Sequence, residues 1–241
     1  MSVVLSGRRH YAHSGKNHSC NRIMGLVMKK DRRIYKMLPL FLVFIGIPLA
    51  LWFLSDFPER SLLMDSLSLL TILAFSLLLA QFFLARTNRE LVKKVKMSNV
   101  LRIHKFIGYI FISVIMLHPF FIIVPKFLDN AVSPKDALIR LITTFDNIGL
   151  VLGLVAYTAM LVIMITSFFR FKLHLKYRTW RTFHAYLTSI FIVAAVWHVI
   201  SLGRHSNTAF IMFYVIALAS GIYYLLRTYL FKPTSKSIKN V

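Results

Sequence analysis

Six apolar runs, each about long enough to cross a bilayer, constrain the fold more than any other feature of the chain. They cover about residues 38–54, 66–85, 106–125, 147–169, 182–203 and 207–226, and none contains Asp, Glu, Lys or Arg. A membrane-spanning helix needs about 20 such residues, whereas a membrane-spanning strand needs about 10 and alternates in polarity. The alternation is absent, so the sequence predicts an all-α, polytopic membrane protein with a six-transmembrane-helix bundle. The third helix is expected to begin earlier, near Asn99.

The composition supports this class and argues against two others. The chain of 241 residues is 57% hydrophobic and only 16% charged, whereas soluble domains are about 25% charged. Its 21 Phe, 10 Tyr and 3 Trp argue against disorder. The one cysteine, Cys20, excludes a disulfide framework and a Cys-rich metal site. No nucleic-acid partner is expected, because the net charge of +22 is better explained by membrane topology.

The basic residues are concentrated on one side of the predicted spans. Of the 30 Lys and Arg residues, 25 lie before the first run, in the connections 86–105 and 170–181, or after the last run. Only Asp31 and Glu90 oppose them there. The positive-inside rule therefore predicts that both termini are cytoplasmic. We expect a basic, flexible tail over 1–36, the six-helix domain over 37–231 and a short tail over 232–241, in a multi-pass protein of a bacterial plasma membrane.

Two of the predicted helices carry histidines at an identical spacing. His104 and His118 lie on the third, and His184 and His198 lie on the fifth, with a separation of 14 positions within each pair. Fourteen residues bring a helix within about 40° of four full turns and advance it by about 21 Å. Each pair therefore shares one helix face. Because the two helices run parallel, His104 is level with His184, and His118 is level with His198.

This arrangement predicts two b-type haems at two depths, each bound by one histidine from each helix. A haem iron takes a neutral imidazole on either side, and helical bundles place such ligands on facing helices. The absence of Cys-x-x-Cys-His excludes covalent attachment. Zinc or copper fits poorly, because the histidines form two separate pairs. The absence of carboxylates within the spans argues against proton pumping.

The residues between the ligands fit the same interpretation. Phe111 and Phe191 each follow an inner histidine by seven residues and are expected to pack between the haems. Gly108 and Ala194 leave room for a flat macrocycle. The alternative is that the histidines only make hydrogen bonds between helices, as membrane histidines often do. The chain is then a haem-free transporter or an assembly factor.

The histidine-containing runs resemble a known family. Leu101-Arg-Ile-His-Lys-Phe-Ile-Gly-Tyr109 with His118, and Trp180-Arg-Thr-Phe-His-Ala-Tyr186 with His198, are similar to helices 3 and 5 of the ferric reductase-like transmembrane domain. That superfamily includes metalloreductases, NADPH oxidase membrane cores and the haem subunits of methionine sulfoxide repair systems. The resemblance implies an inner haem on His104 and His184 and an outer haem on His118 and His198.

The resemblance also implies partners for electron transfer. Larger members continue into a flavin and nicotinamide domain, for which the roughly fifteen residues after Leu226 are too few. The expected donor is a separate flavin reductase subunit or membrane quinol, with flavin or quinone as further cofactors at the cytoplasmic face. A di-haem subunit of a quinol-linked dehydrogenase is a related alternative. The expected acceptor is a ferric chelate or a partner reductase at the outer loop, residues 126–146.

Basic residues flank the inner ligands. Candidates to bind haem propionates or a flavin phosphate are Arg102 and Arg181, together with Lys105 and Arg178. The alternative is that these residues act only as topology determinants at the membrane interface. The same basic surface is expected to attract anionic lipid headgroups or an acidic flavoprotein.

Overall fold

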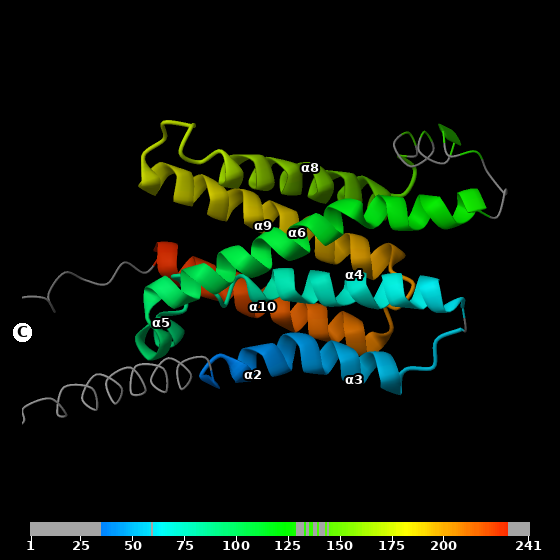
Figure 1. Cartoon of the computed structure of the whole chain (residues 1–241), viewed down its shortest axis with the longest axis horizontal. Coiled ribbons are helices and arrows are strands. Elements are labelled where there is room, and N and C mark those ends of the chain that lie inside the picture. Colours follow the sequence, from blue (N-terminus) through cyan, green and yellow to red (C-terminus); the bar gives the residue numbers. More distant parts are fainter. Residues whose placement is uncertain are drawn as a thin grey trace, which may run out of the picture.

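The computed structural model describes residues 35–58, 60–128 and 145–230, with residues 133, 135, 136, 139 and 143 between the last two segments. The all-α prediction is confirmed, since no strand occurs among these residues (Figure 1). The helical elements are α2 (Leu38–Phe41), the π-helical segment η1 (Leu42–Gly46), α3 (Ile47–Leu54), α4 (Leu62–Ala80), α5 (Arg89–Val95), α6 (Met97–Leu128), α8 (Ile148–Phe168), α9 (Tyr177–Leu202) and α10 (Thr208–Leu230).

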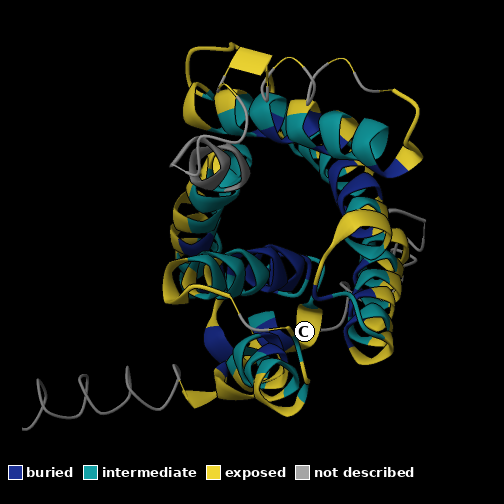
Figure 2. Ribbon diagram, turned by 90° about the vertical axis from the view of Figure 1, so that its right-hand side faces the viewer, coloured by how far each residue is buried: buried dark blue, intermediate teal, exposed yellow. Residues whose placement is uncertain are grey.

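Five long helices form a ring, and the first helical segment packs outside it (Figure 2). α8 packs closely on α9, α4 packs on α6, and α10 joins α9 to α4. A lighter contact between α6 and α8 closes the ring, while η1 and α3 pack on α4 and α3 also touches α10. α6 and α9 therefore lie on opposite sides of the ring and are not a closely packed pair.

Five of the predicted spans correspond to helices, α4, α6, α8, α9 and α10, that are each long and apolar enough to cross a bilayer. The first segment, α2–η1–α3, is apolar but has 17 residues, which give about 25 Å of helix. That length is at the lower limit for a span, so the sixth span stays a prediction. The two tails fall almost entirely outside the described residues.

Two helices begin earlier than the apolar runs predicted. α4 begins at Leu62 instead of Ser66, and α9 begins at Tyr177 instead of Thr182. The expectation that no carboxylate lies within a span therefore fails for Asp65, which is in the first turn of α4. A negative charge in that position is favoured by the positive end of the helix dipole, and an apolarity pattern cannot detect this.

α4 also ends five residues before the predicted boundary at Ala85. The apolar residues that follow belong to a buried turn, in which Phe82 packs against Gly221 of α10. Thr87 Oγ1 and Asn88 Nδ2 donate hydrogen bonds to the carbonyls of Phe82 and Phe83, at 3.0 and 3.2 Å. The apolar pattern continues past the helix because this turn is packed inside the protein.

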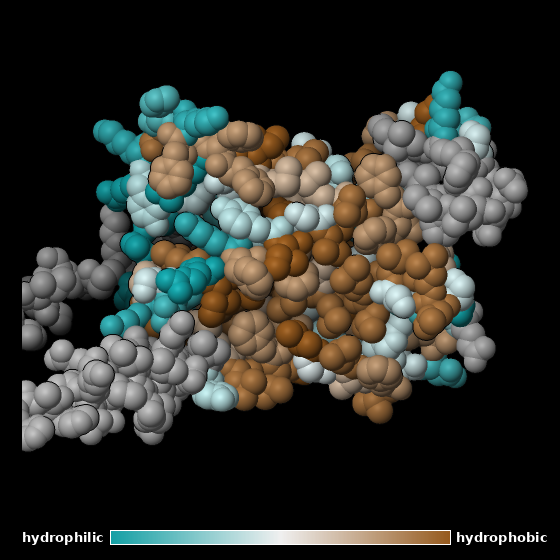
Figure 3. All heavy atoms as spheres, in the orientation of Figure 1, coloured by the Kyte–Doolittle hydropathy of each residue, from teal (hydrophilic) through white to brown (hydrophobic). Residues whose placement is uncertain are grey.

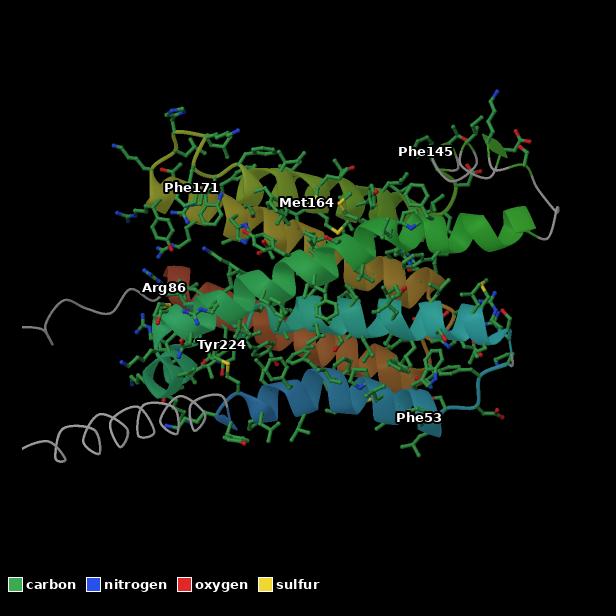
Figure 4. The ribbon with its side chains drawn as sticks, viewed as in Figure 1. Phe53, Arg86, Phe145, Met164, Phe171 and Tyr224 are labelled. Carbon is green, nitrogen blue, oxygen red and sulfur yellow. The ribbon has the colours of Figure 1, made fainter. Side chains whose placement is uncertain are left out.

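The two described ends of the chain lie at the same end of the bundle, beside α5 (Figure 1). Arg86 and Phe171, from two different connections, also lie at this end, and Phe53 and Phe145 lie at the other (Figure 4). The space-filling view shows hydrophilic residues gathered at the α5 end and a mostly apolar surface beyond them (Figure 3). We call the α5 end the basic end, since the connections it carries are the basic ones.

A proline explains how the first segment is attached to the ring. Pro48 has no N–H, so the carbonyl of Phe44, four residues earlier, loses its usual helical donor. The backbone is locally π-helical over Leu42–Gly46. The buried hydroxyl of Ser76, on α4, donates to the Phe44 carbonyl at 2.7 Å. This bond satisfies the carbonyl and fixes the segment against α4.

An aromatic cluster joins two connections at the opposite end. The ring of His205 lies 4.5 Å from that of Trp52 and 4.4 Å from that of Phe57, and it is buried. Burial holds the pKa of His205 below its ordinary value of 6.5, and the charge of Arg204 lowers this pKa further. His205 is therefore held in its neutral form within the cluster.

The hydrogen bond from Ser76 to the Phe44 carbonyl, which Pro48 leaves without a helical donor, predicts that substitutions of Ser76 and Pro48 have coupled effects on stability. Ser76→Ala removes the donor to a buried carbonyl and should lower the free energy of unfolding by about 1–3 kcal/mol. In a Pro48→Ala background the restored N–H can bond to Phe44, so the same substitution should cost clearly less. Thermal unfolding in detergent measures both. Ser66→Ala, which removes an exposed hydroxyl, is the control, and equal costs in the two backgrounds would contradict the explanation.

The buried His205 predicts acid sensitivity. The unfolded chain binds a proton at this residue near pH 6.5, whereas the folded chain resists it. Stability should therefore be retained above pH 6.5 and lost as the pH falls below it. His205→Phe should make the fall in melting temperature between pH 7.5 and pH 5 less steep. His174→Asn, at an exposed loop position, should keep the original slope. An unchanged slope in His205→Phe would disprove the prediction.

Candidate functional site

The four histidines lie on the two helices that face each other across the ring. α6 and α9 both start at the basic end and run in the same direction (Figure 1). His184 is near enough to His104 to be influenced by its charge, and His118 is near enough to His198. This proximity is consistent with the two predicted pairs at two levels of the ring.

The opposite face of α9 explains why its histidines point inward. A stripe of large side chains at helical spacing is exposed toward the lipid, namely Phe183, Tyr186, Ile190, Val193 and Trp197. Phe191 and Ala194, on the histidine face, are buried. Phe111, the corresponding ring on α6, packs against the same core. Both phenylalanines thus belong to the packed core on the histidine-bearing sides of their helices, and their packing between two haems stays a prediction.

Two glycines of α8 provide the place for His198. A Cβ on Gly153 would lie 2.5 Å from Nδ1 and 2.7 Å from Cε1 of His198, so only glycine allows this imidazole to sit here. One turn earlier, a Cβ on Gly149 would lie 2.7 Å from the Cβ of Ser201. Our reading of the sequence missed both residues, although their Gly-x-x-x-Gly spacing is a known signal for close helix packing in membranes.

The same contact fixes the tautomer of His198. Its Nδ1 lies 2.8 Å from the carbonyl oxygen of Gly149, and a carbonyl only accepts hydrogen bonds. Nδ1 must therefore carry the proton, which leaves the lone pair on Nε2. Histidine ligands are commonly oriented in this way, with one ring nitrogen donating to a carbonyl and the other free to bind metal. Asn147, the N-cap of α8, accepts from the Gly149 N–H and supports the turn.

The other three histidines each have a buried nitrogen without a partner. Nδ1 of His104, His118 and His184 makes no hydrogen bond, although it is sealed from solvent. The carbonyls of Gln81 and Leu84 are the backbone acceptors that face His104. Neutral imidazoles in such surroundings are suited to binding a metal and poorly suited to carrying charge.

A proline and a tyrosine shape α6 around His118. Pro119 follows the histidine and interrupts the hydrogen bonding of the helix one turn earlier. The hydroxyl of Tyr157, on α8, donates to the carbonyl of Met116 in that turn at 3.3 Å. This bond is part of the light contact between α6 and α8, and it fixes the helix where His118 projects.

The structure distinguishes the two predicted arginines at the basic end. Arg102 is exposed, whereas Arg181 is half-buried and its Nε is sealed without a hydrogen-bond partner. Arg181 precedes His184 by three residues and so lies on the same side of α9. Of the two, Arg181 is the better placed to bind an anionic group beside the inner pair.

A stack of aromatic rings leads from the surface to His184. The indole of Trp180 lies 5.1 Å from the His184 ring at an interplanar angle of 27°, and Tyr177 lies 6.2 Å from Trp180. The guanidinium of Arg170 is 4.7 Å from the centroids of both Tyr177 and Trp180. Trp180 Nε1 also donates to the Thr166 carbonyl, which fixes the indole. The stack holds the His184 ring from the outside.

These features fit a planar macrocycle bound through two imidazoles better than a single metal ion. No three His, Cys, Asp or Glu side chains gather as metal ligands within the described parts of the chain. The histidines come in facing pairs, and the helices that carry them do not pack on each other. A Cβ on Gly108, one turn from His104, would meet nothing within 4 Å. The residues present therefore fit haem at both pairs, with b-type ligation through histidine alone.

The outer loop proposed to hold the acceptor, residues 126–146, lies mostly outside the described residues. The basic residues of the first 34 positions and of the C-terminal tail also lie outside them. Their predicted roles stay predictions.

Comparisons with known proteins agree with a helical membrane domain. The family described as ferric reductase like transmembrane component matches residues 70–195, a region that contains His104, His118 and His184 and ends three residues before His198. An uncharacterized protein of Archaeoglobus fulgidus is 37% identical over 162 residues, which cover 67% of this chain and 88% of that protein. No solved structure matches the chain. The chain therefore belongs to the ferric reductase-like transmembrane component family.

Proposed function

We propose that this protein carries two b-type haems and passes single electrons from one face of the membrane to the other. The proposal depends on the four histidines that α6 and α9 carry into the ring, His104 opposite His184 and His118 opposite His198. Membership of the ferric reductase-like family supports transmembrane electron transfer as the general activity. The haems supply the redox chemistry, and the protein determines where they sit.

Each residue near the pairs has a defined task in this proposal. The four histidines would hold the haem irons through ring nitrogens, and the Gly149 carbonyl orients His198 by accepting a hydrogen bond from its Nδ1–H. Trp180 holds the His184 ring by stacking on it. Phe111 and Phe191 pack between the two levels and exclude water from the path. Arg181 offers positive charge next to the inner pair.

The charge distribution suggests the direction of transfer. The basic end carries the connections rich in Lys and Arg, which the positive-inside rule assigns to the cytoplasm. Electrons would then enter at His104 and His184 from a separate acidic flavoprotein or from quinol. They would leave at His118 and His198 toward a ferric chelate or a partner reductase. Charge complementarity between the basic connections and a flavoprotein would accelerate their encounter.

The proposal predicts a defined haem content. Purified protein should contain about two haems per chain and give a low-spin b-type signal in a reduced-minus-oxidised spectrum. The double variant His118→Ala/His198→Ala should retain about one, and so should His104→Ala/His184→Ala. Pyridine haemochrome assays measure the ratio. A ratio that is unchanged in either double variant would contradict the assignment.

The same purified protein and its histidine variants distinguish the other candidate functions, donors and acceptors. A haem-free protein would show no such spectrum in any variant and would tolerate loss of one histidine pair. Reduction of a ferric chelate by membranes containing the chain, and not by membranes lacking it, would favour a metalloreductase over a partner-protein reductase. Reduction of the haems by quinol without a flavoprotein would favour quinol as the donor.

The close contact of His198 with Gly153 yields a second prediction. Gly153→Ala places a methyl group where the imidazole now lies, so the ring must move and lose its bond to Gly149. We expect the outer haem to be lost and the haem content to fall to about one per chain, while the inner haem remains. Gly46→Ala is the control, because a Cβ there would meet nothing within 4 Å. Two haems retained in Gly153→Ala would contradict this account.

A further inference from the structure

Buried polar side chains without partners gather at the basic end of the ring. Apart from histidines, the described residues contain three such side chains: Gln81, with both amide atoms unpaired, Ser167 with its Oγ, and Arg181 with its Nε. All three lie at or near helix ends: Gln81 is the C-cap of α4, Ser167 is the last but one residue of α8, and Arg181 is in the second turn of α9. A buried polar group without a hydrogen bond destabilises the folded state, so three at one end suggest a missing partner.

Gln81 is the most informative of the three. It is the C-cap of α4, it is 8% exposed, and its own carbonyl faces the His104 ring. Snorkelling to the interface can explain a basic residue such as Arg181, but it does not explain an uncharged amide sealed inside the packing. By contrast, Ser76, one and a half turns earlier on α4, is equally buried and is satisfied by the Phe44 carbonyl.

The other two side chains lie at one junction of α8 and α9. Trp180 Nε1 donates to the Thr166 carbonyl at 3.2 Å and so joins the end of α8 to the start of α9. Ser167 and Arg181 are the next residues along each helix. The junction lies beside His184, on which Trp180 stacks. Gln81 thus lies next to the inner histidine of α6, and Arg181 and Ser167 adjoin the Trp180–Thr166 contact beside the inner histidine of α9.

The chemistry of these groups indicates what they bind. The Gln81 amide offers two N–H donors, Arg181 Nε offers a third and the Ser167 hydroxyl a fourth. A carboxylate, with two oxygens that accept several hydrogen bonds, matches such donors and binds charged ones strongly. The outer pair lacks a comparable set: beyond its histidines, the buried unpaired group at that end is His205, enclosed by Trp52 and Phe57.

We propose that Gln81, together with Arg181 and Ser167, binds the carboxylate arms of the inner haem. This inference rests on the proposed function and adds the residues that would orient that group. Gln81 acts as a positioning residue, and no bond is formed or broken at it. The inner site therefore recognises its ligand through carboxylates as well as through iron, whereas the outer site depends mainly on iron ligation and apolar contact.

The test uses the full chain in the His118→Ala/His198→Ala background, which leaves the inner site alone. Apoprotein is titrated with iron protoporphyrin IX and with its dimethyl ester, in which both carboxylates are blocked. The free acid should bind about tenfold or more tighter than the ester, the effect expected of charge-assisted hydrogen bonds. In Gln81→Leu this preference should shrink, and binding of the free acid should weaken.

The melting temperature of the apoprotein provides a second measurement, which should change in the opposite direction to haem affinity. Because Gln81→Leu removes an unpaired buried amide, the melting temperature of the apoprotein should stay the same or rise while haem affinity falls. The matched control Ser76→Ala should do the reverse, lowering the melting temperature and leaving the acid-to-ester ratio unchanged. Should Gln81→Leu fail to fold, Gln81→Glu, which places a negative charge against the carboxylates, should abolish the preference.

The outcomes separate this inference from the proposed function. Equal binding of acid and ester by the otherwise unchanged inner site, or an unaltered ratio in the Gln81 variants, would overturn the role of Gln81 while leaving the two-haem proposal intact. A chain that binds neither compound, in this background or with all four histidines present, would overturn both.

Discussion

The close approach of α9 to α8 is the contact on which the rest of the bundle depends. It is permitted by Gly149 and Gly153, because any larger residue would collide with Ser201 or with the His198 ring. α9 packs on α8 and α10 and not closely on α6, and the ring closes through α10, α4 and a light contact from α8 to α6. The separation of α6 and α9, which carry the histidines, follows from this arrangement of helix contacts.

The two histidine pairs are built differently although their spacing is the same. At the outer level, His198 is oriented by a backbone carbonyl and enclosed by helix packing. At the basic end, the Trp180 indole stacks on His184, and the unpaired polar groups of Ser167 and Arg181 are on neighbouring helix turns. A repeated spacing therefore does not imply a repeated environment. Two copies of one cofactor in these surroundings would differ in reduction potential, because burial and hydrogen bonding both tune haem.

Much of the architecture could be predicted from the sequence, because a membrane imposes a simple rule on helix length and polarity. Apolar runs located the five long helices of the described residues, and the identical spacing led to the prediction that His104 pairs with His184. Helix ends were less predictable: the buried turn after Ala80 is as apolar as the helix before it. The partners of individual atoms were not predictable at all. To predict that Ser76 compensates for the hydrogen bond lost at Pro48, one must know which helices are neighbours. The same knowledge is needed to predict that Arg102 is exposed and Arg181 is half-buried.

The short first segment has a consequence for the lipid around the protein. At about 25 Å it falls short of the roughly 30 Å hydrocarbon thickness of an average bilayer, and it lies outside the ring with Leu42 and Phe53 exposed. On the other side of α4, α6 has 32 residues and is about 48 Å long. If the first segment crosses the bilayer as predicted, lipids beside it would thin to match it, while those beside α6 would meet a helix that must tilt or protrude. The annular lipid would then be uneven in thickness around the circumference.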